Sequence, residues 1–89
     1  MTDYYPKQRS DIRIRIIEEE TVVLDSAAEQ IHQLNPTASL IWNGCDGQRT
    51  ATQIAAELTR CFDVDYETAQ QAVDATLRRL DELGLLVRA

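Results

Sequence analysis

The hydrophobic period of the chain changes at Leu34, and this change constrains the fold more than any other feature. Before Leu34, apolar residues alternate with polar ones, which is the pattern of half-buried strands. After it, they recur every three or four residues, which is the pattern of amphipathic helices. Asn35 and Pro36 mark the boundary, because an asparagine side chain can accept a backbone N–H at a helix start and proline fits the first helical position.

Three short strands are predicted before this boundary. In the first, Ile12, Ile14 and Ile16 alternate with arginines, so the isoleucines should share one half-buried face. The second covers residues 21–25, which are rich in β-branched side chains, and the third covers residues 30–34. Because the connections are short, the three strands should form an antiparallel meander.

Three helices are predicted after the boundary, the first of them starting at Pro36. Thr50 and Gln53 have the spacing of a capping box, which opens the second helix. Asp65 is expected to cap the third helix and Gly84 to end it.

The predicted order of elements is therefore β-β-β-α-α-α. Three strands cannot bury their apolar face alone, so the helices must cover it, which gives a small α+β domain. Residues 1–10 are polar and contain a proline, and we interpret them as a flexible N-terminal arm; residues 11–89 are expected to form a single domain. Residues 85–87 are expected to form a short extended tail.

The 89-residue chain has a formal net charge of −6, and the charge is uneven. Residues 1–17 carry four cationic and two acidic side chains, a net of +2, which leaves −8 for the rest. The acidic body argues against nucleic acid and anionic membranes as partners and suits a basic peptide or protein surface, although it can equally serve solubility alone. The chain has no apolar run of membrane-spanning length and no secretory signal at its start, so the cytoplasm is the expected compartment.

Reactive chemistry is sparse in this sequence. Two cysteines and one histidine are too few for a disulfide framework, a thiolate metal site or a two-histidine zinc site. Cys45 and Cys61 are each expected to be small buried hydrophobes. No nucleophile–base pair and no phosphate loop can be recognised, so neither an enzyme nor a cofactor is predicted.

One set of residues keeps a common register along the chain: Leu34, Asn35, Pro36, Thr37, Ala38, Ile41, Trp42, Cys45, Asp46, Gly47, Thr50, Ile54, Leu58, Phe62, Val73, Leu80, Gly84, Leu85 and Leu86. This set resembles the PqqD family. The resemblance implies a winged-helix-like domain, a three-stranded antiparallel sheet packed on a three-helix bundle. It also implies a peptide chaperone that binds the leader of a ribosomally synthesised precursor and presents it to a modifying enzyme, typically a radical S-adenosylmethionine (SAM) maturase, in pyrroloquinoline quinone or related biosynthesis. The peptide, the pathway and the enzyme are not specified.

In the family, the leader adds as a strand to the third strand, in a groove beside the last helix. The residues favour the same edge, since strand 30–34 carries no Lys, Arg or Pro, whereas Arg13 and Arg15 guard the other edge. An equally weighted interpretation is that a short polar edge needs no protection. The last helix can likewise have a wide apolar face that simply packs on the core. The predicted peptide-binding residues are Gln30, Ile31, His32, Gln33, Leu34, Ala72, Thr76, Arg79 and Leu83.

Two alternatives stay open at this point. The first is a winged helix that binds DNA through residues 66–83, but that segment carries four acidic and two basic side chains, so phosphates would repel it. The second is a protein-interaction module of another kind. An exposed strand edge is also compatible with a homodimer, although no residue pattern specifies one.

Overall fold

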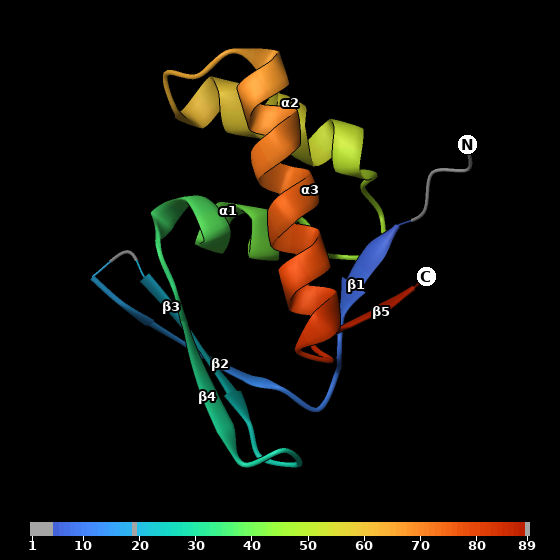
Figure 1. Cartoon of the computed structure of the whole chain (residues 1–89). Coiled ribbons are helices and arrows are strands. Elements are labelled where there is room, and N and C mark those ends of the chain that lie inside the picture. Colours follow the sequence, from blue (N-terminus) through green and yellow to red (C-terminus); the bar gives the residue numbers. More distant parts are fainter. Residues whose placement is uncertain (1–4, 19, 89) are drawn as a thin grey trace.

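The computed structural model describes residues 5–18 and 20–88, and it confirms the predicted order of elements with one strand added at each end (Figure 1). The β2-β3-β4 meander precedes the helices α1, α2 and α3. The elements are β1 (Pro6–Gln8), β2 (Arg13–Ile17), β3 (Glu20–Asp25), β4 (Gln30–Leu34), α1 (Pro36–Gly44), α2 (Ala51–Cys61), α3 (Tyr66–Glu82) and β5 (Leu86–Arg88).

The three-stranded sheet has the order β2-β3-β4, and both pairs are antiparallel. Burial alternates along the central strand β3 and so distinguishes the two faces of the sheet. Thr21, Val23 and Asp25 are buried on one side of β3, here called the inner face. Val22 and Leu24 point to the opposite side, here called the outer face, and are half-buried. Directly paired residues share a face in an antiparallel sheet, so the strand register assigns every residue of β2 and β4 to one of the two faces.

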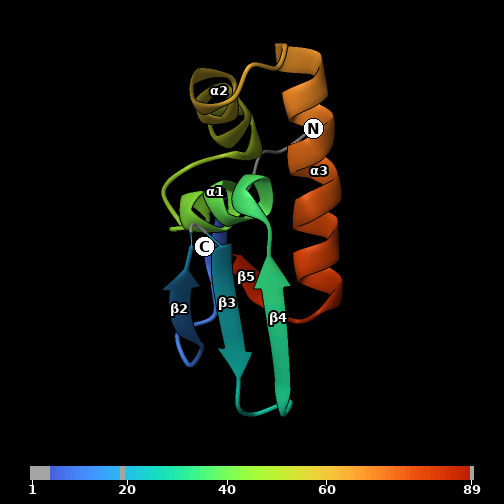
Figure 2. The ribbon, with the colours of Figure 1, turned by 90° about the vertical axis from the view of Figure 1, so that its left-hand side faces the viewer.

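The helices cover only part of the inner face (Figure 2). All five residues of β2 are exposed. The prediction that the isoleucines of this strand are half-buried is therefore wrong for Ile14 and Ile16, of which 37% and 69% are exposed. Ile12, just before β2, does pack against the core. The reason is tertiary, since α1 contacts β3 and β4 but leaves the β2 edge open.

The core consists of two clusters joined along α1. Between the helices lie Ile41 and residues of α2 and α3 such as Ile54 and Val73. Between the sheet and the helices lie Val23, Leu34, Trp42, Leu80 and Leu85. Trp42 is fully buried, as expected for an aromatic residue on the apolar stripe of α1.

The predicted helix starts are confirmed by their capping contacts. The side chain of Asn35 accepts the N–H of Ala38 at 2.8 Å. Thr50 and Gln53 form the complete capping box at the start of α2. Asp65 Oδ1 accepts the N–H of Thr68 at 2.7 Å. Hydrogen bonds from the side chain and from the backbone N–H of Thr68 lower the pKa of Asp65.

The structure corrects the predicted flexible arm over residues 6–9; residues 1–4 lie outside the described part. Strand β1 pairs with β5 in a separate antiparallel sheet, with Pro6 opposite Arg88 and Gln8 opposite Leu86. The side chain of Gln8 also donates to the carbonyl of Trp42 at 2.7 Å. The predicted tail after Gly84 thus becomes a paired strand, because the N-terminal segment supplies partners for its backbone groups.

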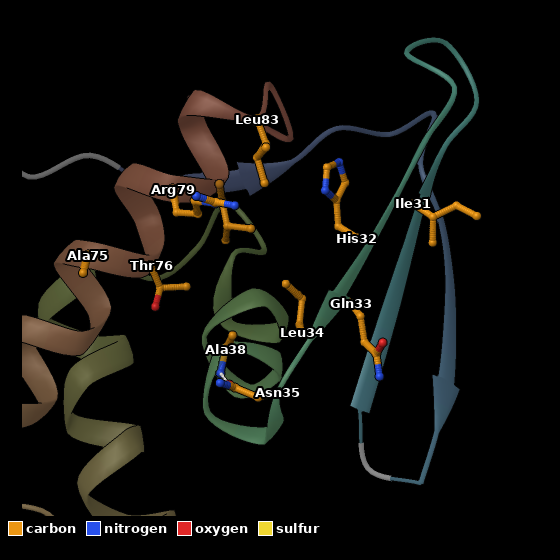
Figure 3. A pocket seen from close by; sticks show the side chains of 11 residues that line it. Ile31, His32, Gln33, Leu34, Asn35, Ala38, Ala75, Thr76, Arg79 and Leu83 are labelled. Carbon is orange, nitrogen blue, oxygen red and sulfur yellow. Dashed lines mark hydrogen bonds between the residues drawn. The ribbon is translucent and has the colours of Figure 1, made fainter.

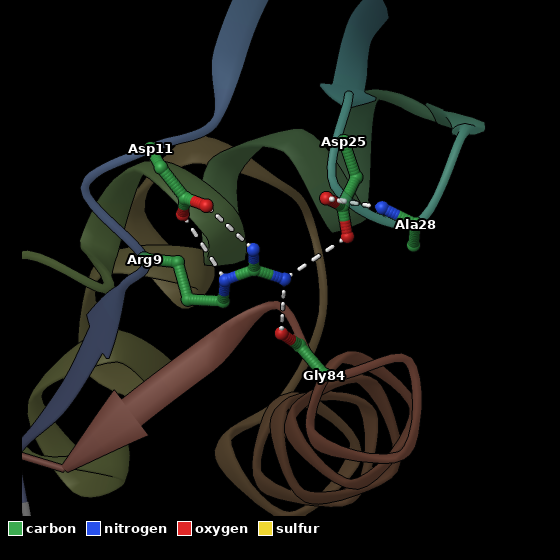
Figure 4. A network of polar contacts seen from close by, with 5 residues as sticks. All are labelled: Arg9, Asp11, Asp25, Ala28 and Gly84. Atoms are coloured by element: carbon green, nitrogen blue, oxygen red, sulfur yellow. Dashed lines mark hydrogen bonds and ion pairs between the residues drawn. The ribbon is translucent and has the colours of Figure 1, made fainter.

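The side chain of Arg9 ties three parts of the molecule together (Figure 4). Its guanidinium donates to Asp25 Oδ2 and to the carbonyl of Gly84, each at 3.0 Å. It also pairs with Asp11, at 2.7 Å between Nη2 and Oδ2, which lowers the pKa of that carboxyl group. Only 2% of Asp25 is exposed, so this carboxylate takes its charge-assisted hydrogen bond inside the fold.

Candidate functional site

A groove of about 460 Å³ runs between strand β4 and helix α3 (Figure 3), and we call it the β4–α3 groove. The elements that form it are fixed by the core cluster between the sheet and the helices, which contains both Leu34 of β4 and Leu80 of α3. Its lining residues are Ile31, His32, Gln33, Leu34, Asn35, Ala38, Ala75, Thr76, Arg79, Leu80 and Leu83.

One wall of the groove is a strand edge without a partner. In the described part of the chain, β4 pairs with β3 alone, and it stands at the end of the sheet order. No Lys, Arg or Pro occupies β4, and 72% of Ile31 is exposed. A row of backbone N–H and C=O groups is therefore available for a further strand.

The other wall is the second stripe of α3. The core stripe of α3 is formed by Ala69, Val73, Leu77 and Leu80, which lie at helical spacing and are buried. Small side chains at Ala75 and Thr76 leave the groove open, and the half-buried Leu83 closes it at the helix end. Arg79 is exposed on the rim and makes no ion pair with any residue that the structure describes.

His32 points into this groove from the inner face of β4, toward the C-terminal end of α3 (Figure 3). Its Nε2 atom is shielded from solvent and has no hydrogen-bond partner among the described residues. A buried polar atom without a partner is unfavourable for the fold.

Seven of the nine predicted peptide-binding residues lie together in the β4–α3 groove, and two do not. Gln30 is on β4 but lines a depression at the end of the β3–β4 hairpin. Ala72 is one helical turn from Thr76 and lines a separate apolar cavity of about 240 Å³ with Leu58 and Phe62. The structure does not bring Ala72 into the groove, because α1 and α2 close over this turn of α3.

Four residues that line the groove were not among the predicted peptide-binding residues, namely Asn35, Ala38, Ala75 and Leu80. Ala75 stands four residues before Arg79 and therefore on the same helix face, a signal that could have found it. Nothing in the sequence pairs α1 with α3, so the contribution of Asn35 and Ala38 is visible only in the tertiary structure.

The two cysteines lie outside the β4–α3 groove. Burial raises the pKa of the Cys45 thiol to about 12, which makes it inert. Cys61 is exposed on the last turn of α2, so the prediction that it is buried is wrong.

Across residues 5–18 and 20–88, no group of three or more His, Cys, Asp or Glu side chains could hold a metal ion. In that same part of the chain, no helix is long and apolar enough to cross a membrane.

Comparison with known proteins identifies the family. The model of the family described as coenzyme PQQ synthesis protein D (PqqD) matches residues 20–86, and the chain belongs to this family, whose members are non-catalytic peptide-binding domains. No curated protein matched the chain.

Three solved structures share the fold. Lasso peptide synthetase B1 complexed with the leader peptide is 25% identical, with a TM-score of 0.82, covering 93% of this chain and 98% of that one. The PqqD truncation of Methylobacterium extorquens PqqCD, described as a functional and stand-alone recognition element for ribosomally synthesised and post-translationally modified peptides, is 26% identical, with a TM-score of 0.76 and coverages of 93% and 88%. TbiB1 in complex with the TbiA(beta) leader peptide, 22% identical, shows the fold alone, with a TM-score of 0.81 and coverages of 90% and 93%.

Proposed function

We propose that this chain binds the leader of a ribosomally synthesised precursor peptide as an added strand on β4 and presents it to a modifying enzyme. The observation that carries the proposal is the β4–α3 groove beside an unpaired strand edge, in a chain of the PqqD family. The relative that is 25% identical was solved with a leader peptide bound, which supports the same class of ligand.

Strand addition gives affinity through the backbone and selectivity through alternate side chains. In an extended peptide every second side chain would point into the β4–α3 groove, where Leu34, Leu80 and Leu83 offer apolar contacts. Arg79 on the rim would pair with a carboxylate of the peptide.

The hydrogen bonds at the end of the β3–β4 ladder indicate which β4 residues face the peptide. The N–H of Thr21 donates to Ser39 Oγ at 3.0 Å, and Ser39 Oγ donates to the carbonyl of Leu34 at 3.1 Å. This hydroxyl bridges the two strands, so Thr21 directs its N–H toward β4. Because hydrogen-bonded and non-hydrogen-bonded pairs alternate, we infer that Ile31 and Gln33 direct their N–H groups outward, to the peptide.

The modifying enzyme we propose is a radical SAM maturase, the usual partner in the family, acting in the cytoplasm. Its identification requires reconstitution. The enzyme encoded beside this chain's gene should modify its precursor faster when the chain is added, and a chain-independent rate would contradict the presenting role.

The test of leader binding is an amide NMR titration of the ¹⁵N-labelled chain with leader peptides encoded beside its gene. We expect shifts concentrated on residues 31–34 and 76–83, and none with a scrambled peptide of the same composition. A duplex DNA of random sequence serves as a second control and should leave these signals in place. Absence of shifts with every neighbouring leader would refute the proposal.

Arg79 allows a sharper test of the groove, because its neighbour Arg78 is an exposed arginine on the same helix that does not line the groove. Arg79→Glu should weaken leader binding about tenfold, through loss of one charge-assisted contact and repulsion of the same carboxylate. Arg78→Glu changes the net charge equally and should change the dissociation constant less than twofold. Equal affinities for the two variants by calorimetry would remove Arg79 from the site.

A further inference from the structure

The outer face of the sheet is left uncovered by the rest of the fold, and no helix lies in front of it in Figure 2. The register places Arg13, Leu24 and Ile31 in one row across the three strands. Arg15 and Val22 begin the next row. Most of Ile31 is exposed, and Val22 and Leu24 are half-buried. Contiguous apolar surface on a sheet face is typical of an interaction site.

The charge of this face is opposite to that of the whole chain. Neither Arg13 nor Arg15 forms an ion pair with any residue that the structure describes, although the chain carries a net charge of −6. One acidic side chain, Glu20, stands on the same face at the end of β3, opposite Ile17. The carboxylate of Glu20 accepts a hydrogen bond from the Gln33 amide, and Glu29 lines the depression at the hairpin end. Two arginines of β2 therefore lie beside an aliphatic strip formed by Val22, Leu24 and Ile31.

We propose that the outer face docks the modifying enzyme, through an enzyme surface that presents carboxylates beside aliphatic side chains. This inference rests on the proposed function and names the surface through which presentation would occur. Unpaired arginines beside an apolar strip match the composition of protein interfaces, in which arginine is enriched and forms bidentate contacts with carboxylates.

The geometry lets both ligands bind at once. The leader occupies the edge of β4 and the groove on the inner side, whereas the enzyme contacts the opposite side of the same sheet. An added strand lies about 4.8 Å from β4 and turns every second side chain to the outer face, beside Ile31. The enzyme would therefore contact the chain and the leader as one continuous surface.

A second copy of this chain is the other candidate for the outer face, and its charge disfavours it. A two-fold interface brings the same patch of each subunit together. Each patch carries Arg13 and Arg15 against the single carboxylate of Glu20, so two patches of net positive charge would oppose each other. The enzyme surface, which can supply carboxylates there, is the better match.

The test is a binding measurement between this chain and the modifying enzyme encoded beside its gene, made with and without leader peptide. The double variant with Arg13→Glu and Arg15→Glu should bind the enzyme at least tenfold more weakly and the leader within twofold of the unaltered chain. The matched control carries Lys7→Glu and Arg78→Glu, two exposed cations away from the outer face, and reaches the same net charge of −10 from −6. It should bind both partners normally.

Unaltered enzyme binding by the outer-face variant would overturn the proposal, whereas absence of leader binding by the unaltered chain would refute only the proposed function. A methyl NMR titration of the unaltered chain with enzyme guards against misfolding of the variant. Signals of Val22, Leu24 and Ile31 should broaden, and that of Val64, at the α2–α3 connection, should not. Broadening of Val64 alone, or concentration-dependent shifts of the three outer-face methyls without enzyme, would also overturn it.

Discussion

At the scale of single residues, burial separates groups that the sequence treats alike. Asp11 and Asp25 both pair with Arg9, but Asp25 is almost fully buried while Asp11 stays exposed. Among the described residues, removing Arg9 would leave the buried Asp25 carboxylate with one side-chain contact, the N–H of Ala28 at 3.3 Å. A buried charge without its partner is strongly destabilising, so the ion pair of Arg9 with Asp25 stabilises the fold although Arg9 lies in a polar N-terminal segment.

The two cysteines should differ in reactivity for the same reason. Cys61 is exposed and should be alkylated by iodoacetamide at pH 8 within minutes, whereas Cys45, with a pKa of about 12, should react only on unfolding. Mass spectrometry of the alkylated chain distinguishes the two. Rapid labelling of Cys45 in the native protein would contradict its place in the core.

The pKa of Cys45 also sets the sign of a pH effect. The folded state keeps this proton while the unfolded chain begins to lose it near its ordinary pKa of 9.0, so stability should fall as pH rises from about 9 toward 12. Cys45→Ala should remove that part of the pH dependence in denaturation curves.

At the scale of elements, strand β4 pairs with β3 along one edge and leaves its other edge open, and its side chains alternate between the inner and outer faces of the sheet. One edge closes the sheet against β3, and the other remains available for strand addition. Its inner side chains, Leu34 and His32, belong to the core and the groove, while Ile31 belongs to the outer face. A change on this strand can therefore be chosen to affect one task alone.

Gln33→Pro should weaken leader binding about fivefold to tenfold and leave the fold intact. Proline removes one N–H, which we infer to face the peptide, and proline is tolerated on an edge strand when that N–H does not serve the sheet. Gln33→Ala removes the same side chain but keeps the N–H, so it should bind nearly normally. Calorimetry on both variants decides the matter, and equal affinities with an intact fold would contradict strand addition at this position.

The close approach of α1 and α2 depends on Gly44. A Cβ atom at this position would lie 2.9 Å from Ile54 Cγ1, which is closer than packed atoms allow. Gly44→Ala should therefore destabilise the protein by about 1–3 kcal/mol in urea denaturation, the usual range for overpacking. In a double-mutant cycle with Ile54→Ala the cost of the alanine should shrink, because the clashing atom is gone; full additivity would show that the contact is not the cause.

At the scale of the whole molecule, the N-terminal segment holds the two sheets together. It supplies β1 to pair with β5, and its Arg9 reaches the β3–β4 hairpin and the turn after α3 (Figures 1 and 4). The segment is therefore part of the folded domain rather than an appendage to it.

Deletion of residues 1–10 should lower the midpoint of thermal unfolding, by about 4–8 °C for each kcal/mol lost in a domain of this size. The loss has two sources, the unpaired strand β5 and the unpartnered Asp25. Full-length Arg9→Gln removes only the second and should fall between the truncated and unaltered chains. A truncated chain with an unchanged midpoint would mean that β1 contributes no stability.

The sequence by itself determined the order of the central elements, the helix starts, the core stripe of α3 and the position of β4 at the end of the sheet. These features depend on local periodicity and on capping contacts within three residues, such as Asn35 with Ala38, so a single segment specifies them. The tertiary structure alone decided the pairing of β1 with β5, the burial of Asp25 and the exposure of Cys61. It also decided the exclusion of Ala72 from the groove and the uncovered outer face. Each of these depends on which distant segments meet, and no local pattern encodes that choice.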